Sequence, residues 1–219
     1  RMDRGEASLD SLLDVRAEQL RPDTYSPLRD RFPARNLRIS LGELLRYSVS
    51  MSDNNACDIL IDYAGGIDSV DAYVRRLCVG DFTLVATEAD MHVDLANQYL
   101  NAAAPATVTR LLQRADSALL FAPEYNAFLQ KIMQETATGV DKLKGLLPPS
   151  VVVGHKTGSS DRTPDGRKIG DNDAGYVILP SGERYYIAVL ISDSHESDAT
   201  NASIIARISR LVYDYLSNL

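Results

Sequence analysis

Three apolar stretches near the end of the chain decide its fold: Val151-Val-Val-Gly-His-Lys156, Ala174-Gly-Tyr-Val-Ile-Leu179 and Tyr185-Tyr-Ile-Ala-Val-Leu-Ile191. Each stretch is short and rich in β-branched or aromatic residues, which is typical of a β-strand. The turn-forming sequence Pro180-Ser-Gly182 joins the second stretch to the third. The three stretches therefore predict an antiparallel meander.

The residues after this meander predict a long helix over 198–218. Its apolar residues recur at the spacing of one helical face, and we expect that face to pack on the strands. These residues are Ile204, Ile205, Ile208, Leu211, Val212, Tyr215 and Leu216.

The residues before the meander predict a block of helices. Ser40-Leu-Gly-Glu43 has the pattern of a capping box, which predicts a helix over 41–50. Residues 79–104 have no clear period, and a loop of this length in a compact chain is usually functional. Further helices are expected over 54–64 (ended by Gly65-Gly66), 68–77, 105–115 and 123–135.

This order of elements predicts an α+β fold in a single domain, 1–219. Its helical part is expected at about 1–148. The antiparallel sheet, with the C-terminal helix packed on it, is expected at about 149–219.

Composition narrows the possible functions of the chain. Of its 219 residues, 45% are hydrophobic and 24% are charged, an ordinary balance for a globular protein. The net charge of −7 and the scattered basic residues argue against a nucleic-acid partner. No apolar run approaches the roughly 18 residues of a membrane span. The three histidines lie far apart, so we expect no metal site.

The chain has two cysteines, Cys57 and Cys78. Both fall in or near predicted helices. Two buried free thiols are favoured over a disulfide between them.

Three short motifs carry the chemistry: Ser52-Asp53-Asn54 between two helices, Glu88 in the long loop, and Lys156-Thr157-Gly158 at the end of the first strand. Each motif alone has a simpler interpretation as a helix cap, a solvated side chain or a turn. Their combination, order and setting are more specific.

The combination resembles the penicillin-recognising serine enzymes, and its order and spacing resemble the class A serine β-lactamases. The loop from Thr87 to Asn101 is similar to the Ω loop of that class, with Glu88 at its catalytic glutamate. The stretches 46–58, 143–148 and 155–158 resemble the PER-type extended-spectrum branch. The resemblance covers the whole chain and implies the β-lactamase/transpeptidase-like fold.

The resemblance implies hydrolysis of penicillins and cephalosporins through a serine acyl-enzyme, without a cofactor. Ser52 would relay a proton to the departing ring nitrogen, Lys156 would hold the substrate carboxylate, and Glu88 would activate the deacylating water. Asp53 is expected to be structural. Substrate contacts are expected from Tyr25, Asn54, Lys142, Thr157, Gly158 and Ser159, with the Ser159 N–H in the oxyanion hole.

Other positions depart from the usual pattern of the class. His92 stands where most class A enzymes have asparagine, and Asn101 where many have the aspartate that closes the loop. Ala89 follows Glu88 in place of the usual proline, which puts a cis peptide at that bond in doubt. Residues 160–172, rich in glycine, proline and charge, are expected to form a long excursion beside the site.

The largest departure concerns the nucleophile. No serine stands three residues before any lysine of the chain, so the S-x-x-K motif is absent from these 219 residues. We therefore expect a domain truncated at its N-terminus and inactive on its own. Such a chain would expose a sheet edge and an apolar face.

Two alternatives to a β-lactamase remain open. One is a D-alanyl-D-alanine peptidase-like acyl transferase, against which Glu88 argues. The other is an inactive fragment that only binds. The family resemblance also implies a periplasmic or secreted protein, monomeric when complete, whose partner is the small β-lactam substrate.

Overall fold

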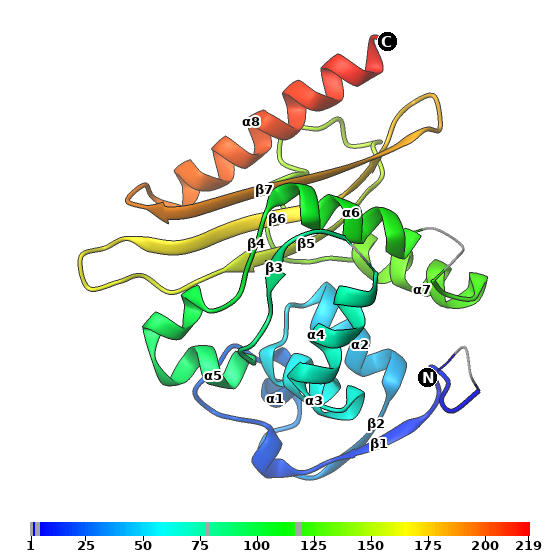
Figure 1. Cartoon of the computed structure of the whole chain (residues 1–219), viewed down its shortest axis with the longest axis vertical. Helices are drawn as coiled ribbons and strands as arrows, with labels where there is room; N and C mark the ends of the chain where they lie inside the picture. The colour runs from blue at the N-terminus through cyan, green and yellow to red at the C-terminus, as the bar shows by residue number, and fades with distance from the viewer. Residues whose placement is uncertain (1, 3–4, 78, 117–119) are drawn as a thin grey trace.

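The structure is a computed structural model that describes residues 2, 5–77, 79–116 and 120–219. A helical part and a sheet part lie side by side, with the last helix across the sheet (Figure 1). The elements in chain order are β1 (Leu12–Val15), η2 (Ala17–Gln19), α1 (Pro27–Arg31), β2 (Leu37–Ser40), α2 (Leu41–Ser50), α3 (Asn54–Ala64), α4 (Ile67–Arg76), β3 (Phe82–Thr83), α5 (Glu88–Val93), η3 (Leu95–Tyr99), β4 (Ala102–Ala103), α6 (Pro105–Asp116), α7 (Pro123–Gln134), β5 (Val153–Ser159), β6 (Lys168–Ile178), β7 (Arg184–Ser194) and α8 (Asp198–Ser217).

The predicted meander is confirmed as an antiparallel sheet in the order β5-β6-β7. One expectation about it is wrong. Residues 160–172 do not form one long excursion, because β6 already begins at Lys168 and pairs Asp171 with Ser159. The charged start of β6 is typical of a loop in sequence. It folds as strand because Lys168 and Asp171 are both buried beside charged partners.

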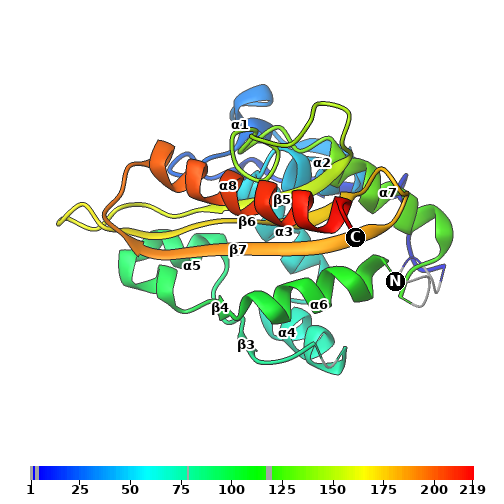
Figure 2. The ribbon, with the colours of Figure 1, turned by 90° about the horizontal axis from the view of Figure 1, so that it is seen from above.

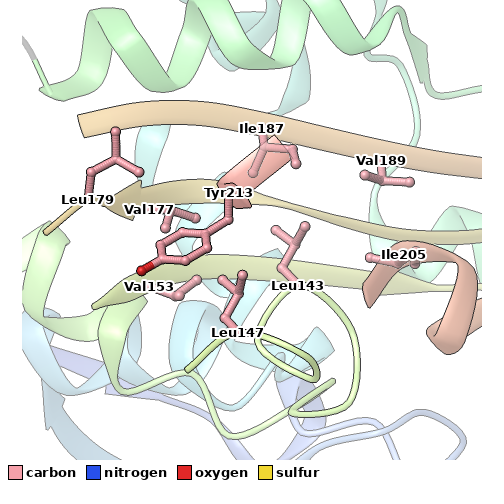
Figure 3. Close-up of a cluster of buried hydrophobic side chains, with 9 residues drawn as sticks. All are labelled: Leu143, Leu147, Val153, Val177, Leu179, Ile187, Val189, Ile205 and Tyr213. Atoms are coloured by element: carbon pink, nitrogen blue, oxygen red, sulfur yellow. The ribbon is translucent and has the colours of Figure 1, made fainter. Parts of the chain in front are cut away.

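Helices cover both faces of this sheet. Figure 2 shows α8 on one face and α6 on the other. The core on the α8 side joins the sheet, α8 and the segment before β5 (Figure 3). Its buried members are Leu143, Leu147, Val153, Val177, Leu179, Ile187, Val189, Ile205 and Tyr213.

The predicted packing face of α8 is only partly correct. Ile205 is fully buried, but Leu211 is 70% exposed and Tyr215 is 68% exposed. Ile204 and Ile208 are exposed as well. The apolar positions cover more than one side of the helix, and the side toward the sheet includes small or polar residues. These are Asn201, Ala202, Ala206 and Ser209, all buried.

Two features of the chain are therefore open to association. One is an exposed apolar stripe on α8 (Ile204, Ile208, Leu211, Tyr215). The other is the outer edge of β7, which has no partner strand in the described ranges. Exposed strand edges and apolar patches favour association.

We predict that the 219-residue chain expressed alone elutes above its 24.0 kDa mass in size-exclusion chromatography with light scattering. Replacing Leu211 and Tyr215 with glutamine should reduce this association. A monomeric parent chain would contradict the prediction.

The helical part has its own core and its expected helix ends. The capping box is confirmed, because Glu43 N donates to Ser40 Oγ at 3.2 Å and Ser40 N donates to Glu43 Oε2 at 3.4 Å. Gly65 ends α3 at a φ of 104°, a left-handed conformation that glycine adopts without strain. The buried members of this core are Val15, Leu20, Leu28, Ile39, Leu44, Tyr47, Ala56 and Ile59.

Cys57 is a free, half-buried thiol, while Cys78 lies outside the described residues. Burial raises the pKa of Cys57 to about 12.

Across the described ranges, no helix has the length and apolar character to cross a bilayer. In the same ranges, no group of three or more potential metal-binding side chains is found.

Candidate active site

The first and third sequence motifs meet where β5 passes the loop between α2 and α3. Lys156 Nζ donates to Ser52 Oγ at 2.7 Å and to the Thr157 carbonyl at 2.6 Å. Lys156 and Ser52 are 104 residues apart in the chain. The fold therefore joins an ammonium group and a hydroxyl in a half-buried setting.

Ser52 is held in an unusual backbone conformation. Its φ of 56° lies in the left-handed region, which costs a residue with a Cβ free energy. The next residue, Asp53, anchors the loop. Its carboxylate is 1% exposed and accepts hydrogen bonds from Leu28 N at 2.6 Å, Ala56 N at 2.8 Å and Ser26 Oγ at 2.9 Å. This geometry fits the structural role expected of Asp53.

Glu88 is the first residue of α5, and a side chain from α3 fixes its backbone. The Asp58 carboxylate accepts the N–H groups of Glu88 and Ala89, both at 2.8 Å. The Glu88–Ala89 peptide is trans, since no peptide of the described residues is cis. The sequence analysis assigned no role to Asp58. The available signal was its spacing from Asn54, because residues four apart share a helical face.

The charged groups of the site are partly removed from water. Burial raises the pKa of Glu88, the Asp58 carboxylate raises it further, and Lys156 opposes this shift. Burial lowers the pKa of Lys156, while Glu88 acts against that shift. An acid and a base with pKa values displaced toward neutrality are typical of groups that exchange protons.

The raised pKa of Glu88 predicts a stability effect. Because the folded-state pKa exceeds the unfolded value of about 4.5, the folded state loses stability as the pH rises from that value through the folded pKa. Glu88→Gln should therefore raise the melting temperature by a few degrees at about pH 7, and by less at about pH 4. Calorimetry would measure both, with the exposed Glu124→Gln as a control. Equal shifts at the two pH values would contradict the prediction.

The edge of β5 offers a backbone donor. Ser160 N donates to Gly170 O within the hairpin, and alternate residues of a strand direct their backbone groups to opposite sides. The Ser159 N–H therefore points to the free edge of β5, away from β6. Thr157 and Thr138 share a hydrogen bond of 2.6 Å between their hydroxyls. Gly158 lies between Thr157 and Ser159 on β5.

Glycine is required where the segment before β5 crosses Thr157. Gly139 has a φ of 58°, and a Cβ there would lie 2.6 Å from Thr157 Cγ2. This close approach holds Thr138 against Thr157. The path of residues 136–150 therefore positions the Thr138 hydroxyl beside the Thr157 hydroxyl.

Lys142 lies behind β5 and has a buried partner. Its side chain is buried, and Nζ donates to Asp171 Oδ1 at 2.5 Å. Asp171 pairs with Ser159 across the strands. The sequence analysis expected direct substrate contact from Lys142. That contact stays a prediction; in the structure the Lys142 ammonium group donates to a carboxylate of β6.

A second buried pair joins β5 to β6. His155 Nδ1 is 2.9 Å from both oxygens of Asp173, and both side chains are fully buried. Asp173 also accepts Leu143 N at 3.1 Å. These contacts hold β5 against β6 at the residue that precedes Lys156.

Tyr25 and Asn54 lie beside the Ser52 loop. Asn54 N donates to the Tyr25 carbonyl at 3.1 Å, and Asn54 Nδ2 donates to Thr24 Oγ1 at 2.7 Å. The Tyr25 side chain is 57% exposed. An exposed ring at this position fits the rim of a cleft.

His92 and Asn101 occupy the loop that carries Glu88. His92 is exposed and close enough to lower the pKa of Glu88. Asn101 Oδ1 accepts Val85 N at 2.9 Å and Ala86 N at 3.0 Å. Asn101 therefore closes the neck of this loop with amide hydrogen bonds.

Comparison with known proteins gives a consistent set of similarities. The sequence model described as the beta-lactamase enzyme family matches residues 1–216. A beta-lactamase of Bacteroides uniformis is 54% identical over 98% of this chain and 73% of its own length. The extended-spectrum beta-lactamase PER-1 of Pseudomonas aeruginosa is 34% identical over 98% of this chain and 69% of its own length. The crystal structure of a class A beta-lactamase from Bacteroides cellulosilyticus has 59% identity and a TM-score of 0.97, covering 100% of this chain and 78% of that one.

Proposed function

The chain belongs to the class A members of the beta-lactamase enzyme family, which hydrolyse β-lactams through a serine acyl-enzyme, and we propose that Ser52, Lys156 and Glu88 serve that reaction in three separate roles. The attacking serine of the family's S-x-x-K motif is not among these residues. The proposed roles are therefore those of the groups around it. The 2.7 Å contact between Lys156 and Ser52 is the observation that carries the proposal.

Ser52 relays a proton when the β-lactam ring opens. Its hydroxyl donates one hydrogen bond and accepts others, so it can pass a proton to the departing ring nitrogen. The Lys156 ammonium at 2.7 Å stabilises the hydroxyl oxygen as its proton leaves. Burial of Lys156, which lowers its pKa, makes the ammonium a stronger acid in this exchange.

Lys156 and Thr157 bind the substrate carboxylate, and the Ser159 N–H receives the oxyanion. A β-lactam acid brings a negative charge that the ammonium and the Thr157 hydroxyl can share. The Ser159 N–H faces the free edge of β5, and one such donor contributes about 3 kcal/mol to the transition state. Lys142, whose ammonium group donates to Asp171, completes the proposed substrate-binding set.

Glu88 activates water for deacylation. A carboxylate whose pKa is raised by burial is a stronger base than a solvated one, and Asp58 holds its backbone in place. Asn54 binds the amide of the substrate side chain, and Tyr25 lines the rim. The hydrolytic base is the feature that favours a β-lactamase over a peptidase-like acyl transferase.

We also propose that the chain forms one domain of a periplasmic or secreted enzyme that acts on penicillins and cephalosporins. The relative named as an extended-spectrum enzyme supports activity on oxyimino-cephalosporins. The chain shares 34% identity with that relative.

The test uses the product of the complete reading frame that encodes these residues. Its turnover of a penicillin, a cephalosporin and a D-alanyl-D-alanine peptide should be measured in parallel. We expect hydrolysis of both β-lactams and no release of D-alanine. Release of D-alanine with slow loss of the β-lactams would favour the peptidase alternative.

A further inference from the structure

We propose that Asp171 is a positioning residue, which holds the Lys142 ammonium group beside Thr157 for the carboxylate of the substrate. This inference rests on the proposed function, in which Lys142 and Thr157 contact that carboxylate. It adds a residue of β6 that acts on the substrate only through Lys142. Both charged side chains are buried, since Lys142 is 8% exposed and Asp171 is 2% exposed.

The Lys142 and Thr157 side chains lie against the same glycine. A Cβ at Gly139 would lie 2.6 Å from Thr157 Cγ2 and 3.1 Å from Lys142 Cδ. The Lys142 charge also reaches Lys156, because burial and, to a smaller extent, this charge lower the pKa of Lys156. An anion bound by Lys156 and Thr157 would therefore also be attracted by the charge of Lys142.

The backbone that carries Lys142 is fixed by three hydrogen bonds. Lys142 N donates to the Gly139 carbonyl at 2.9 Å, and Leu143 N donates to Asp173 Oδ2 at 3.1 Å. Ser209 Oγ donates to the Leu143 carbonyl at 2.8 Å. The long side chain of Lys142 is then the part whose direction depends on a partner.

Asp171 supplies that partner with one of its two carboxylate oxygens. Lys142 Nζ donates to Asp171 Oδ1 at 2.5 Å and to the Asn172 carbonyl at 3.3 Å. An ammonium group has three N–H donors. Within the described ranges, Lys142 Nζ has no third acceptor. One donor is therefore left for a carboxylate that enters the site.

The second oxygen of Asp171 keeps its carboxylate in place. Asn201 Nδ2 donates to Asp171 Oδ2 at 3.3 Å, and Lys168 Nζ lies 3.8 Å from the same atom. Lys168 Nζ also lies 3.0 Å from Asp198 Oδ1 at the start of α8. Residues of α8 and β6 therefore orient the carboxylate, while Oδ1 accepts from Lys142.

The test compares benzylpenicillin with its methyl ester in the complete gene product, because the ester keeps the β-lactam ring and lacks the carboxylate charge. The readout is the ratio of kcat/KM for the acid to kcat/KM for the ester. A defect in folding or in ring opening lowers both values, whereas a defect in carboxylate binding lowers only the first. The variants are Asp171→Asn, Lys142→Met and the two combined. Asp214→Asn, which breaks a partly exposed ion pair on α8, is the control.

We expect Asp171→Asn to lower this ratio about tenfold, mainly through a higher KM for the acid, since charge-assisted hydrogen bonds are the strong ones. Lys142→Met should lower the ratio at least as much. The double variant should lose no more than Lys142→Met alone, because Asp171 acts through Lys142. Asp214→Asn should match the parent.

A second variant covers the case in which Asp171→Asn does not fold. Removing the Asp171 charge takes the anion away from two buried ammonium groups, which is strongly destabilising. Asp171→Glu keeps the charge and displaces the acceptor by one methylene group. It should also lower the ratio, and it decides the proposal if Asp171→Asn is unfolded.

A parent-like ratio in the folded Asp171 variants would overturn the proposal. A further fall when Asp171→Asn is added to Lys142→Met would overturn it as well, because Asp171 would then act by another route. A parent that hydrolyses neither compound would contradict the proposed function instead. Titration calorimetry with the acid and the ester would then decide the role of Asp171 from the two affinities.

Discussion

In the complete gene product, Glu88→Gln is expected to reduce steady-state turnover of a penicillin by about 10³-fold, within the range that a positioned general base contributes. The amide keeps the size of the side chain but cannot accept a proton from water. Acylation should proceed, because the Lys156–Ser52 pair is unchanged. Stopped-flow measurements should show a burst of one equivalent followed by very slow release.

The control for this variant is Glu124→Gln, which replaces an exposed glutamate on α7. It should turn over substrate at the parent rate. If Glu88→Gln loses the burst together with turnover, Glu88 acts before deacylation. The role proposed for it would then be wrong.

Asp53→Ala is expected to lower the free energy of unfolding by about 3–4 kcal/mol, because it leaves several buried donors without an acceptor at once. These donors are Ser26 Oγ, Leu28 N and Ala56 N. The substitution also removes the N-cap of α3. Urea denaturation monitored by circular dichroism would measure the change.

Ser197→Ala provides the comparison, since Ser197 caps α8 from an exposed position. Loss of an ordinary cap costs about 1 kcal/mol. A loss for Asp53→Ala no greater than that for Ser197→Ala would show that Asp53 is only a cap. The account of the strained Ser52 loop would then fail.

The sequence predicted the elements whose signals are local. The capping box at Ser40, the glycine end of α3 and the three strands depend on neighbouring residues, and all are found in the structure. The meeting of Lys156 and Ser52 depends on long-range contacts. It was expected only through the resemblance to a known family.

Polar residues caused most of the differences between expectation and structure. Lys168 and Asp171 resemble loop residues in sequence, yet they lie buried in β6 beside charged partners. The sequence did not predict the partner of Lys142 either, because Asp171 lies 29 residues away in the chain. A single sequence does not reveal which buried charges pair, because pairing depends on strand register.

The exposed stripe of α8 shows a related limit. The apolar spacing of Ile204, Ile208 and Leu211 is that of a packed helical face, but the described sheet contacts the neighbouring side of the helix. Periodicity indicates that a face is apolar. It does not identify the surface that covers it.

Intact-mass spectrometry of the complete gene product mixed with benzylpenicillin tests the assignment as a serine β-lactamase most directly. We predict a transient adduct of one penicillin in the parent protein and a persistent adduct in Glu88→Gln. Peptide mapping should locate the adduct on a serine outside the 219 residues, which by themselves should acquire none. Absence of any adduct from both full-length proteins, or an adduct on a residue of these 219, would contradict the assignment.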